Sequence, residues 1–288
     1  MSAFDLVKGV SNLVSLPEVC VCINSMVDDP TCSIAEMGKI ISLDPSLTAR
    51  LLKIANSSFY SFPARIETVS RAITIIGTRE LRYLILATSA VRSFGRLENS
   101  LVDINTFWRH NIYTGLLARL LASHCRVLHT ERLFVAGLLH DLGHLVMYHR
   151  IPELVKVMQS RAKEANIPMY QAERDVFNVD HGQVARELFR LWNLPASLQQ
   201  VAEFHHEPSK AGDCALEASI VHIANALAEG ADKSSHKTVD LTSIDDAAWR
   251  ITGLSREIVD PLLQEARSQF VETLLLFFPA GQKTERSS

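Results

Sequence analysis

The residues best suited to chemistry in this sequence are a histidine and an aspartate that stand side by side in an apolar stretch. His140 and Asp141 directly follow the apolar run Leu133–Leu139, and Gly143 comes two residues later. Burying a carboxylate beside an imidazole is unfavourable unless the pair is hydrogen-bonded, protonated or bound to a cation. A cation site is therefore one of the three arrangements that this pair allows.

Further histidines stand at positions compatible with a shared site. They are His110 upstream, His181 downstream, and the adjacent His205 and His206. Imidazole nitrogens with one carboxylate suit iron, zinc, nickel, cobalt or manganese, and leave coordination positions for water or a substrate oxygen. For any one of these histidines alone, an ordinary core or surface role is the more frequent one. An ordinary role is the interpretation for His124, His129, His149 and His236.

Helical geometry decides which of these side chains can meet. On the helix expected near Thr106–Ser123, His110 shares a face with apolar residues and points inward. Asp141 is rotated by about 100° from His140 on a helix, so both can reach one site only at a helix edge or bend. His181 begins an amphipathic helix whose apolar stripe turns it inward as well.

The composition indicates a packed globular chain of one large or two modest domains. Of 288 residues, 47% are hydrophobic and 21% are charged, and the formal net charge of −3 argues against a surface wholly devoted to nucleic acid. The N-terminus lacks a basic region before an apolar core, and no apolar run approaches the roughly 20 residues of a spanning helix. We therefore predict a cytoplasmic protein without membrane insertion. Five cysteines without a C-x-x-C pair predict reduced thiols.

The hydrophobic pattern predicts an all-α fold. Almost every segment has a period near 3.6 residues, and alternation bounded by hairpin turns is absent. Ser33 with Glu36 forms a capping box, and helices open at Pro17 and Pro45. We predict further helices near Phe4–Val14, Ile34–Ser42, Val69–Ile76, Arg79–Phe94, Thr106–Ser123, Glu131–Tyr148, Pro152–Ala165, Met169–Phe177, His181–Trp192, Pro195–His205, Leu216–Ala228, Ile244–Thr252 and Arg256–Phe278. A surface loop is predicted over Glu229–Asp240.

A polar segment over Gly95–Asp103 predicts the division of the chain into two lobes. Residues 1–100 would form an N-terminal helical lobe, and residues 101–280 a histidine-bearing lobe with a C-terminal helical extension. Residues 281–288 are predicted to be a flexible tail.

Together with the histidines, several segments resemble the HDOD family, the HD-related output domain of bacterial signalling proteins, which is related to the HD phosphohydrolase superfamily. The segments are Leu16–Val19, Ile40–Ser57, Ala72–Gly77, Ala136–Gly143, Glu173 eight residues before His181, Trp192–Pro195 and His205–His206. The resemblance covers about Leu16–Ala228. It implies an HD-domain-like helical bundle with an N-terminal helical lobe. It also implies a metal-binding series of His110, His140, Asp141, His181, His205 and His206, with Asp141 and His181 as the catalytic residues.

Two positions depart from the catalytic relatives. HD hydrolases end the metal-binding series with an aspartate, where this chain offers Asn225, a neutral and weaker ligand. With Asp141 as the only carboxylate, we expect one divalent ion (iron, zinc, manganese or nickel) or none, rather than a pair. Relatives that cleave cyclic di-GMP carry Gly-Tyr-Pro after His-His-Glu, whereas Glu207 is followed here by Pro208–Lys210. That activity is not expected.

Residues 45–96 carry eight basic residues against two acidic ones. The excess fits either an anionic partner or structural pairing with acids of the other half, and we favour pairing. The helices over Ser33–Ile54 faintly resemble a helix-turn-helix, but Arg50 and Lys53 are the only long polar side chains available to read bases, so DNA binding is not expected. The aromatic loop Phe59–Pro63 fits either a docking surface or a plug between the lobes.

These observations predict a regulatory or interaction module of bacterial signal transduction, with a retained or vestigial metal site and weak or absent catalysis. The expected partner is another signalling protein or a small nucleotide-like ligand. The alternative is a metal-dependent phosphohydrolase acting on a nucleotide or other phosphoester, in which a cation lowers the pKa of a bound water.

Overall fold

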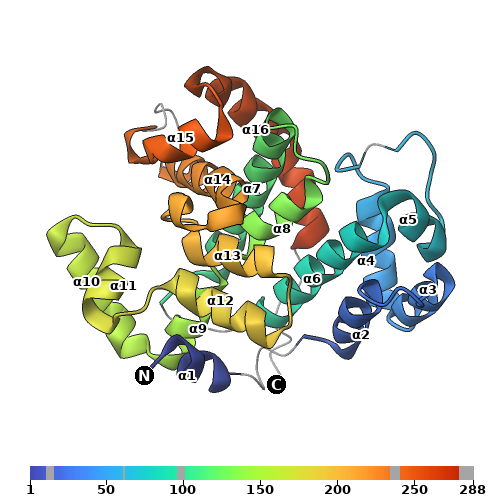
Figure 1. Cartoon of the computed structure of the whole chain (residues 1–288), viewed down its shortest axis with the longest axis horizontal. Helices are drawn as coiled ribbons and strands as arrows, with labels where there is room; N and C mark the ends of the chain where they lie inside the picture. The colour runs from blue at the N-terminus through green and yellow to red at the C-terminus, as the bar shows by residue number, and fades with distance from the viewer. Residues whose placement is uncertain (11–15, 61, 96–100, 234–240, 279–288) are drawn as a thin grey trace, which may run out of the picture.

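The computed structural model describes residues 1–10, 16–60, 62–95, 101–233 and 241–278, and within these ranges it contains helices and no strand (Figure 1). The all-α prediction is therefore confirmed. The α-helices are α1 (Ala3–Lys8), α2 (Glu18–Val27), α3 (Ile34–Ser42), α4 (Pro45–Ala55), α5 (Val69–Ile76), α6 (Thr78–Phe94), α7 (Ile104–His124), α8 (Glu131–Leu139), α9 (Leu142–Arg150), α10 (Pro152–Ala165), α11 (Met169–Phe177), α12 (His181–Leu191), α13 (Ala196–Phe204), α14 (Ala215–Lys233), α15 (Asp246–Thr252) and α16 (Val259–Phe277). Short 3-10 helices occupy Pro208–Lys210, Gly212–Cys214, Leu241–Ser243 and Arg256–Ile258.

Helices α2 to α6 form the N-terminal lobe on the right of Figure 1. The predicted capping box is present at the start of α3, where the Ser33 hydroxyl accepts from the backbone N–H of Glu36 and the Glu36 carboxylate accepts from the backbone N–H of Ser33. Asp44 caps α4 with Pro45 in its first turn. These local signals explain why both helices begin where the sequence predicts.

The second lobe is built around α7, which packs against α8, α14 and α16. Helices α9 and α12 pack against each other below it, and α1 lies against both of them (Figure 1). The first helix, predicted to be part of the N-terminal lobe, therefore contacts the second lobe. The division of the rest of the chain near residue 100 stays a prediction.

Three predicted boundaries are wrong. The single helix Glu131–Tyr148 is divided into α8 and α9, because Asp141 leaves helical geometry (φ −97°, ψ 5°) and becomes the N-cap of α9. Helix α14 continues to Lys233, five residues into the predicted loop Glu229–Asp240, although Gly230 is a poor helix former. Helix α1 ends at Lys8 rather than near Val14. The predicted tail 281–288 lies outside the described residues.

The aromatic loop acts as a plug between the lobes. The Phe59 ring is 2% exposed and lies 5.0 Å from the Phe134 ring of α8 and 6.1 Å from the Phe277 ring of α16, centroid to centroid. The guanidinium of Arg119 on α7 lies 4.0 Å from the centre of the Phe59 ring and donates to the Phe59 carbonyl. Of the two interpretations left open, the structure supports the plug for Phe59.

The basic residues of the first lobe are partly used in structural contacts. Arg82 pairs with Asp28 at 3.1 Å and Arg92 with Asp44 at 3.4 Å. Both acids belong to the N-terminal lobe itself, so the prediction that such residues form structural ion pairs holds for these two, but their partners are not in the other half.

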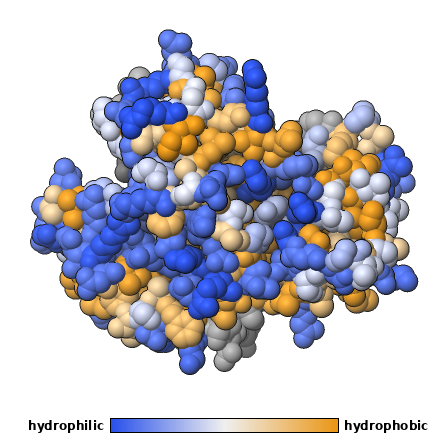
Figure 2. All heavy atoms as spheres, viewed as in Figure 1, coloured by the Kyte–Doolittle hydropathy of each residue, from blue (hydrophilic) through white to orange (hydrophobic). Residues whose placement is uncertain are grey.

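The surface in this view is mostly hydrophilic. Figure 2 shows a hydrophobic band across its upper part, between the region of α15 and the N-terminal lobe. None of the described helices is both long and apolar enough to traverse a bilayer. All five cysteines are free thiols, as predicted.

The contact between α7 and α8 depends on two facing glycines. A Cβ added to Gly137 would lie 2.8 Å from the Cα of Gly115 and 2.9 Å from its nitrogen. We therefore predict that Gly137→Ala lowers the free energy of unfolding by about 2 kcal/mol, because the two backbones must separate. Gly38→Ala is the matched control, since the nearest atom to its Cβ would be the movable hydroxyl oxygen of Ser70 at 3.0 Å and the next would be at 3.8 Å. Urea unfolding checks both variants, and equal stability would contradict the prediction.

Candidate metal centre

The centre is built where α8 ends and α9 begins. His140 is the C-cap of α8 and Asp141 is the N-cap of α9. The break removes the rotation that a continuous helix would impose between the two side chains. Both members of the pair therefore reach the same site, as the sequence predicts for a bend at this point.

Four imidazoles surround the carboxylate of Asp141. Its Oδ1 lies 3.2 Å from Nε2 of His140, 3.3 Å from Nε2 of His181 and 3.7 Å from Nε2 of His205. Its Oδ2 lies 3.9 Å from Nε2 of His110. Residues up to 95 positions apart in the sequence therefore meet at one carboxylate.

His206 and Asn225 complete the predicted set at its edges. Nε2 of His206 lies 2.9 Å from Nε2 of His181. The amide oxygen of Asn225 on α14 lies 2.9 Å from Nε2 of His110. The structure thus brings together all seven residues proposed as metal ligands from the sequence. Two groups of three residues each place their possible ligand atoms within 4.8 Å of one another. One group is His181, His205 and His206, and the other is His110, His140 and Asp141.

Backbone carbonyls orient two of the imidazoles towards the centre. Nδ1 of His140 donates to the carbonyl of Gly137, and Nδ1 of His205 donates to the carbonyl of Ala202, each at 2.7 Å. In a neutral imidazole the other nitrogen then carries a lone pair, and both Nε2 atoms face Asp141. Nε2 of His140 is buried without a hydrogen-bond partner. Lone pairs that converge on a carboxylate fit a bound cation.

Burial keeps most of these imidazoles neutral. It lowers the pKa of His140 to about 4 and holds the pKa values of His205 and His206 well below the usual value, and neighbouring histidines add to the effect at all three. Burial alone would raise the pKa of Asp141, but His140, His181 and their neighbours outweigh it and hold that pKa well below the usual range. An ionised carboxylate among neutral imidazoles is the protonation state that a divalent cation requires of its ligands.

His181 is the exception, because a second carboxylate holds it from behind. Oε2 of Glu173 accepts from Nδ1 of His181 at 2.7 Å and from its backbone N–H at 2.9 Å. Burial would lower the pKa of His181, but Glu173 and Asp141 outweigh it and raise that pKa well above its usual value. Burial would raise the pKa of Glu173, but its contacts with His181 and His144 outweigh burial and lower that pKa.

His144 shares this second carboxylate. Its ring stacks on His181 with centroids 3.7 Å apart, and its Nδ1 lies 3.2 Å from Oε1 of Glu173 without the alignment of a hydrogen bond. Possible ligand atoms of Asp141, His144 and His181 also lie within 4.8 Å of one another. His144 is therefore a further candidate ligand.

Sequence reasoning did not assign His144, Glu173 or His222 to the site. His222 donates from Nδ1 to the carbonyl of His205 at 2.8 Å, so it supports the backbone next to the centre. The i, i+4 spacing predicts that His140 and His144 share one helix face, but the chain breaks between α8 and α9, and the His144 ring stacks on the rings of His181 and Tyr148. Glu173 lies on α11 and His181 on α12, so only their tertiary packing brings them into contact.

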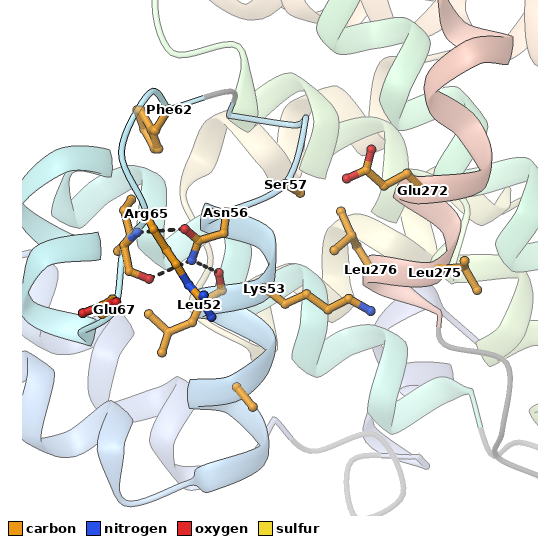
Figure 3. Close-up of a pocket in the computed structure, with 12 residues that line it drawn as sticks. Leu52, Lys53, Asn56, Ser57, Phe62, Arg65, Glu67, Glu272, Leu275 and Leu276 are labelled. Carbon is orange, nitrogen blue, oxygen red and sulfur yellow. Dashed lines mark hydrogen bonds between the residues drawn. The ribbon is translucent and has the colours of Figure 1, made fainter.

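A chamber of about 780 Å³ adjoins the centre, with His206 and Asn225 in its wall. A larger groove of about 1120 Å³ lies elsewhere, between α4, the following loop and α16 (Figure 3). Figure 3 shows Lys53 reaching from α4 across this groove towards α16. None of the proposed metal ligands lines the groove, so the smaller chamber is the one relevant to the centre.

The fold is entirely helical over the described residues, and a His-Asp pair lies at the junction of α8 and α9. These two features define an HD-type domain with an additional N-terminal lobe. The model of the HDOD domain family matches residues 13–208, and the chain belongs to that family. It is 26% identical over 206 residues to an uncharacterised protein of Treponema pallidum, and the match spans 71% of this chain but 39% of that longer protein.

Two solved structures share the fold. One is an HDOD domain protein of unknown function from Geobacter sulfurreducens, with 24% identity, a TM-score of 0.71 and coverage of 96% of this chain and 98% of that one. The other is a protein from Shewanella amazonensis provisionally assigned as a phosphohydrolase, with 21% identity, a TM-score of 0.73 and the same coverage. At this level of identity the likeness establishes the fold.

The raised pKa of His181 leads to a prediction about metal binding. Below that pKa the metal-free imidazole holds a proton that a cation must displace, whereas the neutral His140 and His205 release none. We predict release of about one proton per zinc ion at pH 7, and an affinity that increases with pH up to that pKa. Calorimetry in buffers of different ionisation enthalpy measures this release. Glu173→Gln should reduce it, and equal release in both proteins would contradict the assignment.

Proposed function

We propose that this chain is a signal-transduction module that binds one divalent metal ion at Asp141 and acts through ligand-dependent contacts with a partner, with weak or absent hydrolysis. The observation that supports this is the charge of the ligand set. Asp141 is its only carboxylate, Asn225 contributes a neutral amide, and Glu173 faces the outer side of His181. Two divalent ions would therefore be poorly compensated, and one is the expected number.

The location of the centre supports a regulatory role. The junction that carries His140 and Asp141 is the end of α8, and α8 packs against α6 of the N-terminal lobe. The same helix carries Phe134, which contacts the plug residue Phe59. A ligand that reorganises the junction acts on a helix that touches both lobes, so a partner bound to the N-terminal lobe would respond to it.

The expected ligand is small and the expected partner is another signalling protein rather than DNA. Arg50, one of two candidate base readers, is half-buried and donates to the carbonyl of Thr88 at 3.4 Å. The cyclic di-GMP signature is absent after Glu207, where Pro208–Lys210 forms a 3-10 turn. The first observation argues against DNA as the partner, and the second argues against cyclic di-GMP hydrolysis as the activity.

Metal content tests the proposal directly. We predict about one equivalent of zinc, iron, manganese or nickel in wild-type protein purified without chelator or affinity tag, and less than about one tenth in the double variant His140→Ala, Asp141→Asn. His129→Ala is the matched control, because that histidine is exposed and pairs with Glu80 outside the centre. A folded wild-type protein that remains metal-free when titrated with these ions would refute the metal-binding proposal.

Hydrolysis of a phosphoester is the second candidate, and the chamber beside His206 and Asn225 is the observation that favours it. A bound cation would supply Lewis acidity, and the chain itself would supply Asp141 to hold it. In this second candidate His181 would not be a ligand of the cation and would keep its proton between Asp141 and Glu173, so that binding of the ion would release no proton from it. A proton at that position suits donation to a leaving oxygen.

A turnover assay separates the two candidates. With bis(4-nitrophenyl) phosphate and metal-loaded protein, we predict no turnover above that of the Asp141→Asn variant, because a single ion with one carboxylate is a weak catalytic set. Turnover at least about tenfold above that variant, and also lost in His181→Gln, would place hydrolysis first. The metal content of each variant is measured in parallel, so that loss of the ion is distinguished from loss of a proton donor.

A further inference from the structure

The groove between α4 and α16 is a concave apolar surface that is open to solvent (Figure 3). Among the residues that line it, Ile66 and Leu276 are 1% and 3% exposed and form its floor, whereas Leu275 is 44% exposed. Val271 precedes Leu275 by one turn of α16 and is 64% exposed, so the apolar surface extends along this helix. Contiguous apolar surface of this kind is typical of a site that another molecule covers.

The wall formed by the loop after α4 is fixed by its own contacts. The side-chain amide of Asn56 donates to the carbonyl of Leu52 at 2.8 Å and to that of Ile66 at 2.7 Å, and its oxygen accepts from the backbone N–H of Ile66 at 2.8 Å (dashed lines in Figure 3). The Phe62 ring stacks on the Tyr60 ring, with centroids 5.3 Å apart and 13° between the planes. Because this wall is already ordered, a ligand would not have to organise it.

Exposed cations stand around the groove without partners among the described residues. Lys53 and Arg65 line it, and Figure 3 shows Lys53 extending towards α16. Arg71 of α5 and Arg79 of α6 belong to the same lobe, in which α5 packs against α4. All four are exposed, and none of them forms an ion pair or a side-chain hydrogen bond within the described parts of the chain. The structural pairing expected for the basic residues of this segment therefore does not extend to these four.

The carboxylates of the groove walls do not offset these cations. Glu272 accepts from the backbone N–H and from the hydroxyl of Ser58, and Glu67 is exposed. Two carboxylates therefore stand against four cations. The potential around the groove favours an acidic ligand.

The helical walls determine the kind of segment that fits. The described residues contain no strand, so no sheet edge is available among them to pair with an extended peptide. An apolar groove between two helices instead suits the apolar face of an amphipathic helix. A nucleic acid would place its phosphates against Leu275, Leu276 and Glu272, where neither hydrogen bonds nor charge favour them.

We propose that this groove docks an acidic amphipathic helix of a partner protein. The apolar face of that helix would cover Leu275 and Phe62, and its flanking carboxylates would lie beside Lys53 and Arg65. The inference deepens the proposed function, on which it rests for the control of the partner by the metal centre, whereas the docking itself depends on the groove alone.

A chain of contacts connects the groove to the candidate metal centre. Leu276 lines the groove, and the next residue, Phe277, has its ring 4.6 Å from that of Phe134 on α8, centroid to centroid. Helix α8 ends at its C-cap, His140. A shift of the junction between α8 and α9 would therefore move a wall of the groove.

Two matched peptides test the preference for an acidic helix. The first is a helical peptide of roughly 18 residues, with leucine at every third or fourth position and glutamate elsewhere, and the second has lysine in place of every glutamate. Fluorescence anisotropy with the full chain at low ionic strength is expected to give at least about tenfold tighter binding of the acidic peptide. Absence of binding by the acidic peptide, or equal affinity for the two, would overturn the proposal.

Reversal of two charges tests the residues. Lys53→Glu, Arg65→Glu changes two exposed side chains, and the basic peptide should then bind at least about threefold tighter than the acidic one. Lys163→Glu, Arg250→Glu is the control, because it makes the same change in net charge at exposed positions that do not line the groove, and it should leave the preference unchanged. An acidic preference that survives in the groove variant would contradict the assignment.

The apolar contact is tested at Leu275. Leu275→Gln should weaken binding of the acidic peptide at least about fivefold, whereas Val157→Gln, at a valine of α10 that is 52% exposed, should not change it. Self-association of the chain that Leu275→Gln abolishes would assign the groove to a second copy instead. A DNA duplex that bound more tightly than the acidic peptide, and no longer bound after the charge reversal, would assign it to nucleic acid. Either result would overturn the proposal.

Titration of the acidic peptide with and without zinc separates the docking from the proposed function. If the peptide binds equally well in both states, or if the protein binds no metal, the docking stands and the control of the partner by the metal centre is wrong. If the protein binds zinc but not the peptide, the docking is wrong and the metal centre is unaffected.

Discussion

The partly buried carboxylate of Asp141 is the group on which the arrangement of the second lobe depends. Four imidazoles, from α7, the end of α8, α12 and the end of α13, approach it within 3.9 Å. Each must be kept in place although several present lone pairs to a negative charge. The chain does this from behind, with the carbonyls of Gly137 and Ala202 and the carboxylate of Glu173. These contacts therefore hold the imidazole lone pairs close to the carboxylate of Asp141 despite their mutual repulsion, which a proton or a cation between them relieves.

The same constraint explains the close helix contacts around the centre. A Cβ on Gly143 would lie 1.9 Å from the carbonyl oxygen of His181, so α9 and α12 approach each other as closely as backbones allow. That approach places His181 opposite Asp141, and it requires glycine in the first turn of α9, two residues after Asp141. The close helix packing and the geometry of the site therefore depend on the same residue, because any larger residue at position 143 would move the imidazole of His181 away from the carboxylate of Asp141.

Local signals made much of the fold predictable. The capping residues Ser33 and Asp44 determine where two helices begin, and the hydrophobic period identifies nearly all the others. The convergence of His110, His181 and His205 was expected from family resemblance rather than from spacing, since contacts across such separations depend on tertiary packing. The contact of Glu173 with His181 was missed for the same reason, and so were the contacts of His144 with both of them. The division of α8 from α9 was missed as a boundary although the bend had been anticipated, because the apolar pattern continues through it.

Regulation and hydrolysis share their first requirement, a cation among these imidazoles, and diverge in what surrounds it. A hydrolytic centre needs enough negative charge to hold its ions and a proton donor directed at the substrate. Here the two negative charges are in different places, because Asp141 faces the centre while Glu173 lies behind His181. Glu173 is 0% exposed and contacts His181 and His144 on the side away from the centre. A carboxylate placed behind an imidazole strengthens and orients that ligand but does not neutralise a second metal ion. This division favours a centre that binds firmly over one that turns over rapidly, and it is the physical basis for ranking the regulatory role first.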